Sequence, residues 1–139
     1  MPNENGADKN KELIRHIMED GFNKADMAVV YDCFHTDYQR HGHGVASMTS
    51  LAEHVEDLKA RHAAFSVAKF TIRKIVGDGD TVAVQFDFTG IHSGTFNGLP
   101  ATGNSVKRPA AAFFVIRDGK VAEGTVFADG AGFMAQLAE

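Results

Sequence analysis

Two histidines in this sequence lie close enough together to act on one molecule, at His41 and His43. In an extended segment, residues two apart face the same side, so both imidazoles are expected to point in one direction. They could share a proton-transfer role or bind a metal ion, because histidine titrates near neutral pH and is a common ligand. A metal site needs three or four ligands, and the sequence does not identify the others. We therefore predict no metal and no cofactor, and the alternative for this pair is a solvated polar loop.

Asp129 is the second candidate for acid–base chemistry. Apolar walls such as Phe127 and Phe133 would raise the pKa of this carboxyl and suit it to general-base catalysis. The alternative is that Asp129 caps a short terminal turn that begins near Gly130. We predict that Asp129 and His41 are the catalytic residues, and the capping alternative stays open.

Other side chains could orient a ligand. Asp87 lies between Phe86 and Phe88 in a strand-like segment, so its carboxylate faces either a pocket or the outer face of a sheet. Simple alternation favours the outer face. These three residues and His43 are kept as ligand-binding candidates, and the others are Tyr38, His92, Arg108, Val126 and Phe127.

The elements that must position these residues begin with three helices. Residues 11–20 carry apolar side chains at helical spacing, and Asp26 can cap a second short helix over residues 27–34. Ser50 and Glu53 have the spacing of a capping box at the start of the third helix. The apolar stripe of that helix is predicted to be Leu51, Val55, Leu58, His62 and Phe65. Its water-facing side is predicted to carry Glu53, Glu56, Asp57 and Lys59.

From Lys69 onward the apolar pattern has a period of two, which indicates strands. The predicted strands cover residues 69–76, 81–91, 106–117 and 120–127, and glycine-rich turns separate the first pair and the last pair. Helices in a block before strands indicate the α+β class. We expect a cone, in which a curved antiparallel sheet wraps around the N-terminal helices and holds a pocket on its concave face.

Length and composition limit the possible functions. The chain has 139 residues with 44% hydrophobic side chains, which suits one domain with a real core, and residues 1–9 are expected to be a flexible polar tail. The net charge of −4 and the lack of a basic cluster argue against nucleic acid or an anionic membrane surface as a partner. No apolar run approaches the roughly 18 residues of a membrane span. The single cysteine fits the cytoplasm, where we expect the protein to act.

Several segments resemble one known family. Residues 89–94 and 98–103 read Thr-Gly-x-His-x-Gly and Gly-x-Pro-x-Thr-Gly, as in the central stretch of SnoaL-like proteins. The turn at residues 118–121, the terminus at 132–137 and the segment at 37–41 also resemble that family in order and spacing. The likeness runs over nearly the whole chain. It implies the fold shared by ketosteroid isomerase and nuclear transport factor 2, with one pocket in each subunit of a homodimer.

The resemblance also shows where this chain departs from the family. In the antibiotic cyclases a carboxylate on the last strand does the acid–base work, and its position is Val126 here. A histidine on the preceding strand of those cyclases corresponds to Ala112, and a common His-Trp pair corresponds to Gly124 and Thr125. Valine cannot move a proton, so these departures argue against the usual cyclase route.

Two functions remain open from the sequence. The first is a small-molecule enzyme that performs acid–base isomerisation, cyclisation or lyase chemistry on an apolar, carbonyl-bearing substrate, with Asp129 and His41 as its proton-handling pair. The second is a non-catalytic module of the same fold that binds a small ligand or dimerises. Both faces of the central strands carry apolar residues, and one layer of helices can cover only one face, so we also expect a homodimer through the outer face.

Overall fold

The computed structural model describes residues 4–138 of the chain. Its helices are α1 (Glu4–His16), the π-helical η1 (Ile17–Phe22), α2 (Met27–Cys33), α3 (Leu51–Ala64) and α4 (Gly130–Ala138). Its strands are β1 (Phe34–His43), β2 (Phe65–Asp78), β3 (Thr81–His92), β4 (Ser105–Arg117) and β5 (Lys120–Ala128). None of the helices within the described residues is both long and apolar enough to cross a membrane.

The first helix starts earlier than the sequence predicts. Residues 4–9 were expected to belong to a flexible tail, but they form the first turns of α1. Ala7 is buried, and its carbonyl oxygen lies close to Gly77 near the end of β2. Lys11 also pairs with Asp8 at 3.1 Å. Packing against the sheet therefore holds this polar stretch in a helix, and residues 1–3 lie outside the described part of the chain.

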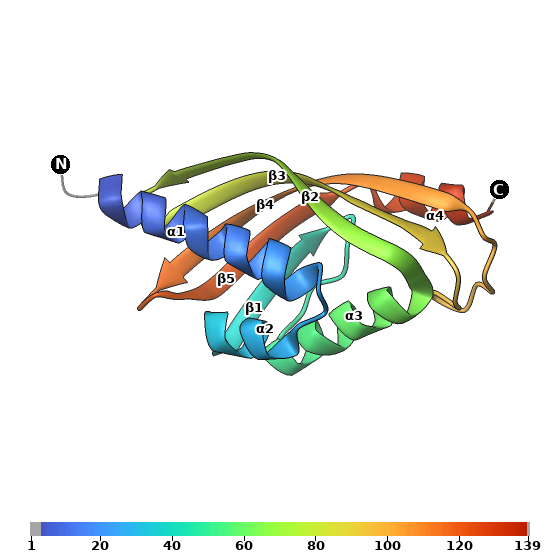
Figure 1. Cartoon of the computed structure of the whole chain (residues 1–139), viewed down its shortest axis with the longest axis horizontal. Helices are drawn as coiled ribbons and strands as arrows, with labels where there is room; N and C mark the ends of the chain where they lie inside the picture. Colours follow the sequence, from blue (N-terminus) through green and yellow to red (C-terminus); the bar gives the residue numbers. More distant parts are fainter. Residues whose placement is uncertain (1–3, 139) are drawn as a thin grey trace.

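The sheet has the strand order β1-β5-β4-β3-β2. Strands β2 to β5 form the predicted antiparallel meander, but β1 pairs with β5 in parallel, so the sheet is mixed rather than wholly antiparallel. This pairing joins segments far apart in the chain, and no turn signal in the sequence marks it. Helices α1, α2 and α3 lie on the concave side of the arched strands (Figure 1). The α+β cone is confirmed.

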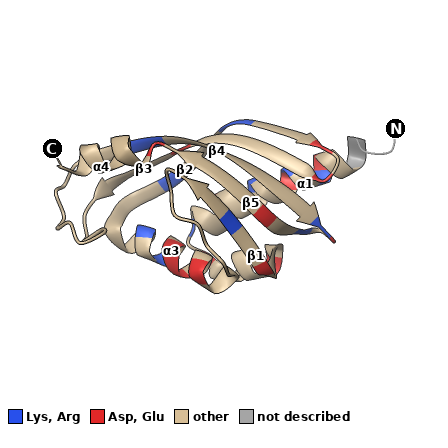
Figure 2. Ribbon diagram, turned by 180° about the vertical axis from the view of Figure 1, so that it is seen from behind, with Lys and Arg blue, Asp and Glu red and all other residues tan. Residues whose placement is uncertain are grey.

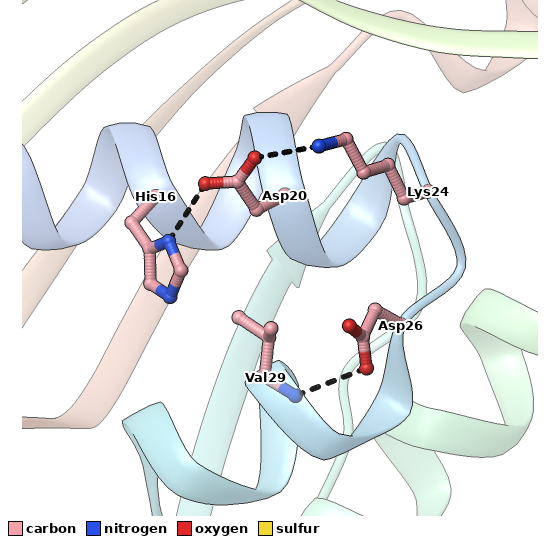
Figure 3. A network of polar contacts seen from close by, with 5 residues as sticks. All are labelled: His16, Asp20, Lys24, Asp26 and Val29. Carbon is pink, nitrogen blue, oxygen red and sulfur yellow. Dashed lines mark hydrogen bonds and ion pairs between the residues drawn. The ribbon is translucent and has the colours of Figure 1, made fainter.

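Asp26 begins α2 as predicted. Its carboxylate oxygen Oδ1 accepts hydrogen bonds from the backbone N–H groups of Ala28 and Val29, at 3.1 and 3.5 Å. Figure 3 shows the bond from Val29. On the preceding helix, Asp20 lies between His16 and Lys24, with contacts of 2.8 and 3.0 Å. The hydrogen bond from His16, followed by that from Lys24, lowers the pKa of Asp20. These side chains are exposed to solvent, so their contacts contribute little to the free energy of folding.

Helix α3 has the predicted N-cap, since the backbone N–H of Glu53 donates to Ser50 Oγ at 3.2 Å. The Glu53 carboxylate in turn accepts from the backbone N–H of Thr49 at 3.3 Å. The buried face of the helix differs from the predicted stripe, because it includes two polar residues at the same helical spacing. The buried residues are Leu51, His54, Val55, Leu58, Arg61 and Ala64. This face points into the cone and supplies much of the candidate site.

Candidate active site

The cone holds a cavity with an outer and an inner part, which have four lining residues in common. The outer part has a volume of about 350 Å³ and opens between α3, residues 44–46, residues 95–97 and α4. The inner part has a volume of about 50 Å³ and lies deeper among apolar side chains, including Phe70, Phe86 and Phe114. Both parts are lined by Val45, Asp57, Arg61 and Arg108, which we call the neck. A mostly apolar cavity with a few convergent polar groups is the usual form of a small-molecule site.

Three arginines are buried around this cavity. Arg40 on β1 is 7% exposed, Arg61 on α3 is 6% exposed and Arg108 on β4 is 5% exposed. Asp57 Oδ2 lies 3.6 Å from Arg40 Nη1 and 3.5 Å from Arg61 Nε. Asp57 is the only carboxylate among the described residues that line either part. The cavity therefore has an excess of two positive charges.

Each of these arginines has one buried hydrogen-bond donor that no described residue accepts from. Arg40 Nη2, Arg61 Nη1 and Arg108 Nε are buried and have no partner among the described residues. Arg108 also has no ion pair within residues 4–138. Its burial, and then the neighbouring charges of Arg61 and Arg40, lower the pKa of Arg108 to about 9. Buried donors without partners are costly, so these groups mark a place where an acceptor would be stabilised.

Two of the arginines make cation–π contacts with phenylalanine rings. The guanidinium of Arg61 lies 5.5 Å from the ring centre of Phe88 and 5.6 Å from that of Phe96. The guanidinium of Arg108 lies 5.9 Å from Phe88 and 5.3 Å from Phe133. Cation–π contacts of this kind hold a guanidinium in place and leave its N–H groups free to bind a ligand.

His54 is the buried imidazole of the inner part. It packs against Phe22, Phe34 and Tyr38, with ring centres 5.3 to 5.6 Å apart. Neither ring nitrogen has a hydrogen-bond partner among the described residues. Burial, with a further contribution from the charge of Arg40, lowers the pKa of His54 to about 4. At neutral pH this imidazole is uncharged and has a free nitrogen that can accept a proton.

Tyr38 supplies a hydroxyl group to the same inner part. Burial raises the pKa of Tyr38, so its hydroxyl stays protonated and can donate a hydrogen bond. A Cβ atom added at Gly124 would lie only 2.6 Å from this hydroxyl oxygen. The glycine on β5 therefore leaves room for the tyrosine, at the position where the resemblance implies a histidine in many relatives.

The fold and cavity agree with the sequence comparison. The sequence profile of SnoaL-like polyketide cyclases matches residues 12–137. This chain belongs to the SnoaL-like polyketide cyclase family. A search of curated protein sequences gives no match.

Solved structures show the same fold at low sequence identity. A SnoaL-like candidate polyketide cyclase from Jannaschia sp. CCS1 has a TM-score of 0.86 and 22% identity, over 95% of this chain and 93% of that one. IdmH, a candidate polyketide cyclase from Streptomyces antibioticus, has a TM-score of 0.80 and 24% identity, over 94% and 99%. An LEH-like epoxide hydrolase from M. tuberculosis has a TM-score of 0.76 and 13% identity, over 96% and 92%. These likenesses establish the cone fold of this SnoaL-like protein.

Four predicted ligand-binding residues line the inner part of the cavity. They are Tyr38, Phe86, Arg108 and Val126. Val126 contributes an apolar wall, at the position where the resemblance to the antibiotic cyclases implies a carboxylate. Phe88 is fully buried and lies beneath the arginines rather than at the cavity surface. The alternation predicted for β3 is therefore present, because Phe86 and Phe88 point into the cone and Asp87 points to the other face.

Three other predicted ligand-binding residues belong to the outer face of the sheet. His43 stacks on Phe127 with ring centres 4.6 Å apart, and both side chains lie outside the two-part cavity. Asp87 Oδ2 pairs with Arg73 Nε at 2.7 Å and with Lys107 Nζ at 3.7 Å. Strand alternation explains the outcome. Asp87 and Phe127 each follow a residue that points inward, and His43 lies on the same side of β1 as the exposed His41.

His92 lies in the core rather than at the cavity. Its Nδ1 is 3.0 Å from Thr102 Oγ1, its ring packs near Phe65, and it lines neither part of the cavity. Within residues 4–138, no three side chains of the His, Cys, Asp and Glu types gather as a metal site requires.

The structure does not bring His41 and Asp129 together as a proton-handling pair. His41 Nε2 hydrogen-bonds with Glu123 Oε2 at 3.1 Å, on the half-exposed outer side of β1. Asp129 Oδ1 accepts from the backbone N–H of Gly132 at 2.8 Å, as an N-cap of α4 does. The alternation of β1 points Tyr38 inward and His41 outward. We therefore replace this pair by the buried residues described above.

Four site residues were not predicted from the sequence, namely Arg40, His54, Asp57 and Arg61. Arg40 follows Tyr38 by two positions, so strand alternation could have placed both on the same face. His54 and Arg61 each lie three positions after an apolar stripe residue, Leu51 and Leu58. Asp57 was predicted to face water, but its side chain is only 22% exposed because it faces two arginines.

The capping role of Asp129 gives a direct prediction. Asp129→Ala is expected to lower the free energy of unfolding by about 1 kcal/mol, because α4 loses its N-cap. Asp129→Asn is expected to change stability and activity little, since asparagine caps about as well as aspartate. Urea unfolding of both variants and the wild type measures the effect. A large loss of activity in a folded Asp129→Asn variant would return this carboxylate to the catalytic site.

Proposed function

We propose that this SnoaL-like protein is a small-molecule enzyme that removes a proton next to a carbonyl group and stabilises the resulting enolate. The observation that carries this proposal is His54, an uncharged imidazole with free nitrogens in an apolar cavity next to unpaired arginine donors. A base and an oxyanion donor in a site that excludes water are what enolisation requires. Isomerisation and cyclisation are the two outcomes that such a site supports.

In this mechanism His54 accepts the proton. A base with a pKa near 4 is about as basic as an ordinary carboxylate, and it is fully available at neutral pH. The free Nη2 of Arg40 donates to the oxygen that becomes negatively charged, and the Tyr38 hydroxyl is a second donor. Asp57 holds Arg40 by their ion pair, and the carbonyl of Ala46 accepts from Arg40 Nε at 3.0 Å. The donor is thus fixed before the charge develops.

The proton held on His54 must then be returned. In an isomerisation, His54 gives it to a different carbon of the enolate. In a cyclisation, the enolate carbon attacks a second carbonyl of the same substrate, and the new alkoxide takes the proton. Both routes leave the enzyme in its starting protonation state and need no other reactant.

Solvent deuterium exchange tests this proposal without a known substrate. The protein is incubated in deuterium oxide with a panel of cyclic ketones and β-dicarbonyl compounds, and deuterium uptake is followed by mass spectrometry. We expect exchange above the buffer rate, with the same rate in Asp129→Asn. Panel compounds that bind in the cavity but exchange only at the buffer rate would instead favour a non-catalytic binding module, which the apolar Val126 and Ala112 would suit.

We also propose that this protein forms a homodimer through the outer face of the sheet. Phe113 and Phe127 are exposed there, 46% and 43%, with ring centres 6.4 Å apart. Residues 109–116 of β4 include no charged side chain, and much of this strand is tan in Figure 2, the colour of residues without a charge. An apolar patch of this kind on a sheet face favours a self-complementary contact.

Sedimentation at micromolar concentration tests the dimer. We expect a dimer for the wild type and a monomer for Phe113→Glu, because a buried unpaired carboxylate is costly. Tyr31→Glu is the matched control, since Tyr31 is also an exposed aromatic residue but lies on α2. A wild type that sediments only as a monomer would contradict this proposal.

A further inference from the structure

The excess positive charge of the cavity remains unexplained by proton transfer alone. We propose that the substrate carries a carboxylate, which binds between Arg61 and Arg108 at the neck of the cavity. This inference rests on the proposed function for what happens to the rest of the substrate, but the anion site itself depends only on the arginines.

The two arginines offer what a carboxylate needs. Arg61 Nη1 and Arg108 Nε are buried donors without a partner, and Arg108 has no ion pair among the described residues. A buried guanidinium is stabilised strongly by an opposite charge and weakly by a neutral group. Charge-assisted hydrogen bonds from arginine to a carboxylate are also about twice as strong as neutral ones. An anion at the neck therefore satisfies both the charge and the donors.

Charge balance favours a carboxylate over a phosphate group. Three arginines and Asp57 leave an excess of two positive charges. A carboxylate neutralises one of them when the substrate binds. The second is neutralised only when the enolate forms next to Arg40, so the site is most complementary to the enolate state. A dianionic phosphate would neutralise both charges before any reaction and leave less stabilisation for the enolate.

The sizes of the two parts of the cavity indicate where the apolar body and the reacting group of this substrate would lie. The neck residues line both parts, so a carboxylate bound there has the outer part on one side and the inner part on the other. The outer part, about 350 Å³, can hold the apolar body beside Phe96, Phe133 and Met134. The inner part, about 50 Å³, takes only a small group and contains His54. The reacting carbon is thus a few bonds from the carboxylate.

Binding of the carboxylate would also strengthen the base. Burial is the largest cause of the low pKa of His54, and the charges of Arg40 and Arg61 lower this pKa further. A negative charge at the neck offsets the arginines, so the pKa of His54 rises when the substrate binds. A substrate without the carboxylate would meet a weaker base.

Calorimetry with a pair of matched probes tests the anion site. The full chain is titrated with 2-naphthoate and with 2-naphthamide, which has nearly the same shape but no charge. We expect naphthoate to bind at least about tenfold more tightly, as charge-assisted hydrogen bonds imply. Arg108→Gln should reduce this preference to about twofold or less. Arg73→Gln should keep it, because Arg73 pairs with Asp87 on the outer face.

The outcomes separate this inference from the proposed function. Equal binding of the two probes by the wild type, or no detectable naphthoate binding at millimolar concentration, overturns the carboxylate site whether or not Arg108→Gln folds. Deuterium exchange that is as fast on a ketone carrying a phosphate group as on the matching keto acid would overturn the choice of carboxylate. A clear preference for naphthoate without any deuterium exchange would support the anion site and remove the proton-transfer proposal. Deuterium exchange on neutral ketones, without any preference for naphthoate over naphthamide, would support the proton-transfer proposal and remove the anion site.

Discussion

Replacing His54 with glutamine is expected to lower the rate of proton exchange by roughly 10²–10⁴-fold, the usual contribution of a general base. Glutamine keeps a polar side chain of similar reach but cannot accept the proton. Exchange rates at neutral pH, with circular dichroism to confirm folding, measure the effect. His62→Gln is the matched control, because His62 lies on the same helix and hydrogen-bonds with the carbonyl of Phe22 without lining the cavity.

The pH dependence of stability provides an independent check on His54. Its pKa is about 4 in the folded state and 6.5 for the unburied group, so the unfolded chain binds more protons between these values. The contribution of neutral His54 to stability is therefore complete above about pH 6.5 and is lost as the pH falls towards 4. His54→Gln should flatten this part of the stability profile, measured by urea unfolding. A variant that keeps both the exchange rate and the wild-type pH profile would rule out His54 as the buried base.

Removing the carboxylate of Asp57 is expected to cost about 3 kcal/mol of unfolding free energy, at the lower end of values for a broken buried ion pair. Asp57→Ala leaves Arg40 and Arg61 buried with like charges and no counter-ion. The lower end applies because the Asp57 side chain is still 22% exposed. Chemical denaturation of the variant and the wild type measures the difference.

The matched control for this change is Asp37→Ala. Asp37 pairs with Arg117 at 3.7 Å, but its side chain is 75% exposed, so the loss should be between about 0 and 1 kcal/mol. Adding Arg61→Met to Asp57→Ala should restore part of the lost stability, since the second variant removes one of the unpaired charges. Equal small losses for Asp57→Ala and Asp37→Ala would mean that the three arginines are well solvated, which would also weaken the proposed anion site.

The fold could be predicted from the sequence because its signals are local. The change of apolar period, the turns and the Asp26 cap all act within a few residues. The structure confirms the turns and the cap, but it begins β2 at Phe65 rather than at the predicted Lys69. The parallel pairing of β1 with β5 could not be predicted, because it depends on packing between distant segments. Residues 4–9 were assigned to a tail for the same reason, since their helix is held by contacts with the far end of β2.

The candidate site was harder to predict than the fold. Tyr38 and Arg108 were selected as polar residues on strands, and both line the cavity. His54 and Arg61 were missed because a polar residue on an amphipathic helix is usually solvent-exposed, and only tertiary packing makes this case different. His41 was predicted from its residue type and from the family resemblance of residues 37–41. The sequence does not fix the phase of β1, so it could not show whether this side chain points into the cone or away from it.

The pairing of β1 with β5 also affects the order in which parts of the protein can fold. His41 on β1 meets Glu123 on β5, which lies 82 positions later in the chain. Contacts between such distant segments form slowly, because closing a long loop costs chain entropy before any contact is gained. Arg40 and Tyr38 reach the cavity from this same strand. A ribosome-bound or truncated chain that ends before β5 would therefore contain α1 to α3 and all three cavity arginines, but it would lack α4 and have no assembled cavity.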